Sequence, residues 1–137
     1  EYFKGVCTSV GFLTIILTMV NSKLPLSKIE EEQWAAPLTS KKAFEYIMRY
    51  DPYYGVRQQK YPMLYFSNSL TDPRVGFYES LKFIQKLREN KKDNNPVIMR
   101  CDLAASHGGA SSRWDALKKD VIPEQAWILK IFNKHKS

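Results

Sequence analysis

Two short apolar runs separated by a helical pattern constrain the fold of this chain more than any other feature. Residues 63–66 (MLYF) are apolar without interruption, as is typical of parallel strands covered on both faces, and residues 97–101 (VIMRC) form a second run. Between them, residues 77–90 carry apolar side chains at helical spacing, namely Phe77, Leu81, Ile84 and Leu87. Together with an apolar stretch at residues 4–10, this order predicts one α/β domain with a mostly parallel sheet flanked by helices.

The rest of the chain predicts further helices. We expect a short helix within residues 11–20 and another over residues 41–50, begun by Thr39 or Ser40 and ended by Asp51-Pro52. The buried face of the second should carry Phe44, Ile47 and Met48. The last stretch, residues 111–134, predicts a helix that Pro123 kinks or divides. Its expected core residues are Trp114, Leu117, Val121, Ile128, Leu129 and Phe132.

Charge and composition argue against several function classes. The chain has 21 Lys and Arg against 14 Asp and Glu, a net charge of +7, but its lysines are scattered and no nucleic-acid motif accompanies them. Residues 5–20 are uncharged, yet this stretch is slightly shorter than the roughly 17–25 residues that span a bilayer. No basic segment or cleavage site frames it as a signal peptide. We therefore expect neither a nucleic-acid partner nor a membrane partner.

The two cysteines and two histidines predict neither a metal nor a cofactor. Cys7 and Cys101 lie in apolar, strand-like contexts, which favours buried free thiols in a reducing compartment over a disulfide scaffold. No cluster of His, Cys, Asp or Glu has the spacing of metal ligands.

Asp72 and His107 each follow one of the two apolar runs that define the predicted sheet. An acid followed in the chain by a histidine, each on a loop after a strand, is the order of the second half of a Ser-Asp-His triad. Neighbouring strands lie about 5 Å apart, so the two loops can touch. Gly108 and Gly109 would let the second loop turn tightly. The same residues also fit a plain Asp-Pro turn and a surface histidine, and no G-x-S-x-G sequence occurs in the 137 residues.

Six sequence words occur in order along nearly the whole chain. They are Pro25-Leu26 with Glu30-Glu31-Glu32-Gln33-Trp34, Phe44-Glu45-Tyr46-Ile47 with Tyr50-Asp51-Pro52-Tyr53, Tyr61-Pro62, Asp72-Pro73-Arg74-Val75, Lys86-Leu87-Arg88, and His107-Gly108-Gly109 with Ser112-Arg113-Trp114. Together they resemble the prolyl oligopeptidase family of serine peptidases, in its oligopeptidase B branch. The resemblance implies that residues 1–137 are the C-terminal part of an α/β-hydrolase catalytic domain. The propeller domain, the oxyanion-hole residues and the nucleophile would then precede Glu1.

The resemblance also implies roles for five residues. Asp72 and His107 would be the acid and the general base of the triad, and Arg74 would hold a substrate backbone carbonyl near the scissile bond. Glu30 and Glu32 would bind a basic side chain before the cleaved bond, which suits their chemistry because two carboxylates can hold a guanidinium bidentately. For these two glutamates an exposed acidic turn is the alternative.

Several segments depart from the family's pattern. Residues 12–15 carry no acid, Trp34-Ala35-Ala36-Pro37 replaces the usual Trp-Gly-Asn-Pro, and Ser67-Asn68-Ser69-Leu70 replaces a Thr-Gly-rich approach to the acid. These departures indicate a divergent member and leave its specificity open.

The resemblance therefore implies a fragment of a cytoplasmic serine-type oligopeptidase that hydrolyses short peptides after Arg or Lys. By itself the fragment should be inactive, because a base without a nucleophile and an oxyanion hole cannot form an acyl-enzyme. The alternatives are a degenerate, non-catalytic α/β module that acts in protein interaction and a basic nucleic-acid-binding module. We also expect the strand edge at residues 4–10 to be exposed, which leads to self-association or a rearranged N-terminus.

Overall fold

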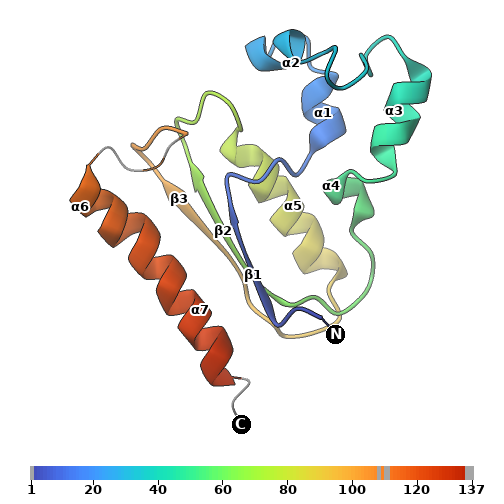
Figure 1. The fold of residues 1–137 in the computed structure, drawn as a ribbon. Coiled ribbons are helices and arrows are strands. Elements are labelled where there is room, and N and C mark those ends of the chain that lie inside the picture. Colours follow the sequence, from blue (N-terminus) through green and yellow to red (C-terminus); the bar gives the residue numbers. More distant parts are fainter. Residues whose placement is uncertain (1, 108, 110–111, 135–137) are drawn as a thin grey trace.

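Three parallel strands form the sheet around which the chain is built (Figure 1). In the computed structural model, which describes residues 2–107, 109 and 112–134, these strands are β1 (Gly5–Ser9), β2 (Met63–Ser69) and β3 (Val97–Asp102). Their order is β1-β2-β3, and the register runs from Gly5 opposite Met63 to Ser69 opposite Asp102. The predicted α/β class with a parallel sheet is confirmed, and the carboxyl ends of the three strands lie at one edge.

Helices cover both faces of this sheet (Figure 1). One face carries α5 (Phe77–Asn90), and the other carries α6 (Arg113–Ala116), the π-helical turn η1 (Leu117–Val121) and α7 (Ile122–Lys134). Successive residues of β2 point to opposite faces. Leu64 and Phe66 join the core beneath α5, whereas Met63 and Tyr65 pack against Trp127 of α7. Both faces of β2 are buried, which is why its sequence is continuously apolar.

Four short helices lie in the connection between β1 and β2. They are α1 (Ile15–Met19), α2 (Pro25–Ile29), α3 (Lys41–Met48) and α4 (Pro52–Gly55). Figure 1 shows them gathered beyond the carboxyl end of β1, next to the start of α5. Two buried carboxylates attach α1: Glu79 of α5 accepts hydrogen bonds from the backbone N–H groups of Leu13 and Thr14, both at 3.1 Å, and Asp51 accepts one from Ile16 at 2.9 Å.

The helices at residues 41–50 and 77–90 are present as predicted, but the structure changes which side chains they bury. Of the two predicted caps of α3, it is Ser40 whose side chain accepts the Ala43 N–H, at 3.3 Å. Phe44 is 38% exposed, and on α5 Leu81 is 51% exposed. Glu79, a charged residue, is fully buried in α5. Its burial is possible because its carboxylate accepts hydrogen bonds from backbone N–H groups of the segment between β1 and α1.

Two further predictions about helices need correction. The sequence pattern did not predict α2, although Pro25 stands at its first turn, where proline is favoured. The last stretch is divided near Pro123, as expected, but its core is different: Trp127 is buried, Ile128 is half-buried, and the other predicted core residues are exposed. These exposed residues are Trp114, Leu117, Val121, Leu129 and Phe132. A sheet of three strands is too narrow to cover the remaining apolar sides of this helix.

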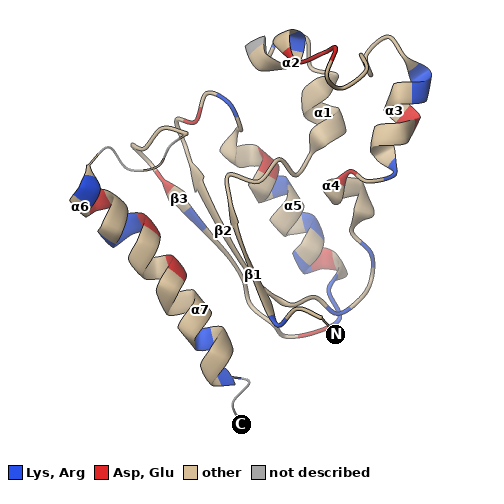
Figure 2. Cartoon of the chain, in the orientation of Figure 1, with Lys and Arg blue, Asp and Glu red and all other residues tan. Residues whose placement is uncertain are grey.

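The surface carries mixed charge. Figure 2 shows Lys and Arg distributed over α3, α5, α6 and α7 and interleaved with Asp and Glu. Cys7 and Cys101 are free thiols that are half-buried rather than fully buried, and burial raises the pKa of both. None of the described helices is long and apolar enough to cross a membrane.

Candidate active site

The loops that follow β2 and β3 bring Asp72 and His107 into direct contact. We call residues 70–76 the acid loop, and residues 103–107 together with Gly109 the histidine loop. His107 Nδ1 lies 2.8 Å from Asp72 Oδ2 and 3.0 Å from Oδ1, although the two residues are 35 positions apart in the sequence. Because Ser69 and Asp102 are register partners at the ends of their strands, the two loops start side by side.

The surroundings of Asp72 hold it as a carboxylate. Its side chain is fully buried, which disfavours the charged form, but the backbone N–H groups of Arg74 and Val75 donate to Oδ1 at 2.8 and 3.0 Å and His107 contacts both oxygens. These contacts outweigh burial and hold the pKa of the Asp72 carboxyl below its ordinary value. A carboxylate only accepts, so His107 Nδ1 carries a proton in this contact, and in the neutral imidazole Nε2 is then the acceptor. This is the orientation that a general base requires.

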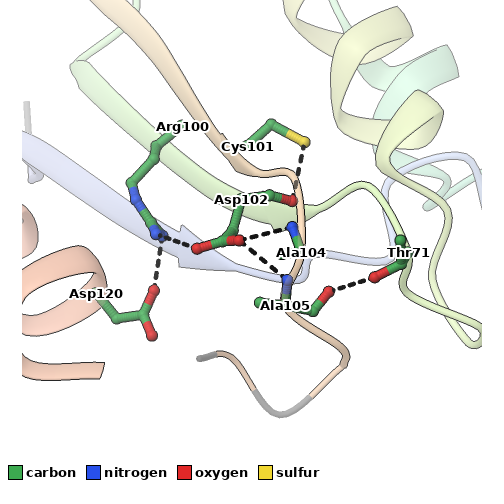
Figure 3. A network of polar contacts seen from close by, with 7 residues as sticks. All are labelled: Thr71, Arg100, Cys101, Asp102, Ala104, Ala105 and Asp120. Atoms are coloured by element: carbon green, nitrogen blue, oxygen red, sulfur yellow. Dashed lines mark hydrogen bonds and ion pairs between the residues drawn. The ribbon is translucent and has the colours of Figure 1, made fainter. Parts of the chain in front are cut away.

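A polar network lies beneath the histidine loop (Figure 3). Asp102 Oδ1 accepts the N–H groups of Ala104 and Ala105, both at 2.9 Å, and Oδ2 lies 3.1 Å from Arg100 Nη2. Arg100 Nη1 in turn donates to Asp120 Oδ1 at 2.6 Å. The two backbone donors are the main reason that the pKa of the Asp102 carboxyl is lowered. Sequence reasoning missed these residues, although opposite charges two positions apart at a strand end, Arg100 and Asp102, were a visible signal.

A cavity of about 230 Å³ opens beside His107 at the carboxyl ends of the strands. Asn68 lines it and is 5% exposed, and both polar atoms of its side-chain amide lack a hydrogen-bond partner among the described residues. Val10 also lines the cavity and has φ +48°, a strained conformation for a β-branched residue. Buried unpaired polar atoms and backbone strain are both features that cluster at functional sites.

The residues predicted to bind substrate do not line this cavity. Arg74 is exposed, and its backbone N–H helps to hold Asp72. Glu30 is half-buried in a separate groove of about 390 Å³ that Trp34, Tyr46 and Tyr50 also line, whereas Glu32 is exposed and does not line that groove. Among the described residues, Glu30 and His107 therefore line two different cavities.

Within residues 2–107, 109 and 112–134, no serine hydroxyl hydrogen-bonds to His107, although Ser9, Ser67, Ser69 and Ser106 line the cavity. The same residues include no group of three or more His, Cys, Asp or Glu side chains that could hold a metal ion. Gly109 has φ +86°, so the turn does require a glycine there; Gly108, the other predicted turn residue, lies outside the described residues.

The amino-acid sequence is similar to known serine peptidases over nearly its whole length. The model of the family described as "Prolyl oligopeptidase family" matches residues 1–135. Protease 2 of Moraxella lacunata is 35% identical over 129 residues, an alignment that covers 94% of this chain and 18% of that protein.

Solved structures are similar over the same length. Oligopeptidase B from Leishmania major superimposes with a TM-score of 0.90 at 34% identity, and oligopeptidase B from Trypanosoma brucei with covalently bound antipain with 0.89 at 37% identity. Each comparison covers 96% of this chain and 18% of the other, so the chain spans less than a fifth of the length of these relatives. The three-strand sheet with its helices matches part of their α/β-hydrolase domain, as the sequence predicts.

Proposed function

The chain belongs to the prolyl oligopeptidase family of serine peptidases, and from that premise we propose that the protein carrying it is an oligopeptidase that cleaves short peptides after Arg or Lys. In that protein this chain supplies the acid and the general base of the triad, Asp72 and His107. The observation that carries the proposal is the 2.8 Å contact between His107 Nδ1 and the fully buried carboxylate of Asp72.

The chemistry follows from the proton positions. As a serine Oγ of the whole protein attacks the scissile carbonyl carbon, His107 Nε2 takes the hydroxyl proton, and the carbonyl π electrons move onto the oxygen. Asp72 stabilises the imidazolium that forms. When the tetrahedral intermediate collapses, the C–N bond breaks, His107 gives its proton to the leaving amine, and an acyl-serine ester remains. A water molecule then attacks the ester carbonyl as His107 Nε2 takes its proton, and His107 returns that proton to the serine oxygen as the C–Oγ bond breaks and the acid product leaves.

The preference for a basic residue rests on Glu30 and Glu32. Two carboxylates within reach of one guanidinium or ammonium would stabilise it by charge-assisted hydrogen bonds and would gain nothing from a neutral side chain. Glu30 borders a groove lined by Trp34, Tyr46 and Tyr50, whose aromatic faces also attract cations. Arg74, exposed beside the acid, would hold a substrate backbone carbonyl.

A serine-directed fluorophosphonate tests the triad in the full-length protein. We expect covalent labelling of one serine by the wild-type protein, and labelling slowed by at least about 1000-fold in His107→Gln, because the hydroxyl then has no base to take its proton. Asp115→Asn, on helix α6, is the control, because the half-buried Asp115 side chain accepts a hydrogen bond from Ser112 and does not contact His107 among the described residues; it should label at the wild-type rate. Equal labelling of His107→Gln and the control would refute the proposed role of His107.

The specificity test compares N-acyl-arginyl and N-acyl-leucyl para-nitroanilides. Glu30→Gln and Glu32→Gln should each lower kcat/KM for the arginyl substrate by roughly 10- to 100-fold, since each removes one charged partner, and should leave the leucyl substrate within twofold. Glu31 lies between the two, and Glu31→Gln is the control that tests whether Glu30 and Glu32 are the correct glutamates of the motif. If Glu31→Gln has the largest effect, the assignment of the two glutamates is wrong.

The same labelling experiment decides between this function and a non-catalytic α/β module that acts through protein interaction. A full-length protein with no G-x-S-x-G serine that does not react with the fluorophosphonate would support the second function. The observation that favours this second function is that the 137 residues contain no G-x-S-x-G motif.

A further inference from the structure

The acid loop and the histidine loop are joined by a side chain as well as by the catalytic pair. In the described part of the chain, the backbone ladder between β2 and β3 ends where the N–H of Leu70 donates to the carbonyl of Asp102 at 2.8 Å. One residue further on, the hydroxyl of Thr71 donates to the carbonyl of Ala105 at 2.7 Å (Figure 3). The Thr71 hydrogen bond therefore extends the pairing of the two strands into their loops. Its donor immediately precedes Asp72, and its acceptor lies two residues before His107.

The acceptor carbonyl is itself held in place. Asp102 fixes the start of the histidine loop through the N–H groups of Ala104 and Ala105, and Arg100 joins that carboxylate to Asp120. At the other end of the loop, a Cβ on Gly109 would lie 2.9 Å from Asp120 Oδ2, so the loop is closely packed against η1 there. Both ends of the histidine loop are thus anchored to β3 and η1, and Thr71 ties its middle to the acid loop.

We propose that Thr71 is a positioning residue, whose hydroxyl holds the acid loop and the histidine loop in the register at which Asp72 meets His107 Nδ1. The inference rests on the proposed function, because it assumes that the pair works as acid and base. Without the hydroxyl, the hydrogen bonds left between the two loops among the described residues are the Leu70–Asp102 backbone bond and the Asp72–His107 contact. The imidazole then samples orientations in which Asp72 does not stabilise the imidazolium.

Two substitutions separate the hydroxyl from the shape of the side chain. Thr71→Val removes the donor and keeps the branched shape, whereas Thr71→Ser keeps the donor and removes the methyl group. In the full-length protein with an N-acyl-arginyl para-nitroanilide, Thr71→Val should lower kcat roughly 10-fold with KM unchanged within twofold, because misplacing a catalytic group costs rate rather than binding. The acidic limb of its kcat/KM profile should move to lower pH, since the imidazolium is stabilised less. Thr71→Ser should match the wild type in both.

Crystal structures of the same proteins give a readout that needs no activity. We expect the His107 Nδ1–Asp72 Oδ2 distance to stay near its present value in Thr71→Ser, and to lengthen or to split between conformers in Thr71→Val. An unchanged contact in Thr71→Val, or an unchanged acidic limb, would overturn the proposal, as would a Thr71→Ser protein that behaves like Thr71→Val. If the wild-type protein cleaves nothing, the proposed function fails, and the crystal structures still decide whether Thr71 positions the pair.

Discussion

Replacing Asp72 with asparagine probes the proton arrangement of the site with almost no change in shape. The carboxylate accepts the N–H groups of Arg74 and Val75 on Oδ1 and faces His107 with Oδ2. In Asp72→Asn the amide oxygen must keep the position of Oδ1, because an NH₂ group there would face two backbone donors. The NH₂ group therefore takes the position of Oδ2 and donates to His107 Nδ1. That contact forces the proton onto Nε2, where it blocks acceptance of the serine proton.

The expected fall in kcat/KM of Asp72→Asn has two causes, the lost charge and the wrong tautomer. An ion pair about 4 Å apart is worth about 4 kcal/mol at an effective dielectric constant of about 20, and solvent at the 34% exposed imidazole screens part of this. About 3 kcal/mol of imidazolium stabilisation corresponds to roughly 100-fold in rate. The wrong tautomer adds at least another factor of ten, so we expect kcat/KM to fall about 1000-fold or more.

The assay is steady-state hydrolysis of an arginyl para-nitroanilide by the full-length protein at neutral pH, with Asp115→Asn as a control of equal charge change. Asp72→Ala separates the two causes, because it removes the anion without imposing a tautomer. Asp72→Asn should be at least as slow as Asp72→Ala, although it preserves more of the side chain. Activity of Asp72→Asn within tenfold of the wild type, in a protein that melts cooperatively, would show that the proton arrangement inferred here is wrong.

Four further outcomes are expected. The isolated 137-residue chain should not hydrolyse the arginyl substrate; turnover that disappears in His107→Ala would contradict this. The isolated chain should also self-associate in sedimentation experiments, because Tyr2, Phe3 and Phe132 are exposed along a groove beside β1. Phe132→Lys should increase the monomer fraction, and a wild-type chain that is monomeric would contradict the expected self-association. Ala35 and Ala36 have φ +55° and +52°, so Ala35→Gly should raise the free energy of unfolding by about 0.5–1 kcal/mol in denaturant titration, and a loss of stability would contradict the strain. Burial opposes ionisation of Asp93, but the Lys91 ammonium and the N–H groups of Tyr61 and Asn95 lower the pKa of its carboxyl. The stability that these contacts contribute is therefore present above the unfolded pKa near 4 and is lost as pH falls through the lower folded pKa. Asp93→Asn should lower the free energy of unfolding by about 2 kcal/mol at pH 7 and by much less near pH 2, and a pH-independent difference would refute this.

The elements of the fold could be predicted because their signals are local. The uninterrupted apolar run at residues 63–66 reflects burial on both faces of β2, and the spacing of Ile84 and Leu87 matches the buried side of α5. The burial of Glu79 had no such signal. A glutamate is almost always exposed unless its carboxylate is paired, and here the donors are backbone N–H groups more than sixty residues away in the chain. The predicted core residues of α7 were wrong for a related reason. Periodicity shows which side of a helix is apolar, but it does not show how wide the surface is that covers this side.

The candidate site divides in the same way. The sequence alone placed Asp72 and His107 on successive loops after strands, and the order of these residues together with six family words was enough to predict their partnership. Only the tertiary structure decided that the carboxylate is buried under the N–H groups of Arg74 and Val75 and that Arg100, Asp102 and Thr71 hold the loops beside each other. Among the described residues, it also placed Glu30 and His107 in the linings of two different cavities. Motifs report which groups are present along the chain, whereas the register of β2 against β3 sets which of them come within hydrogen-bond distance.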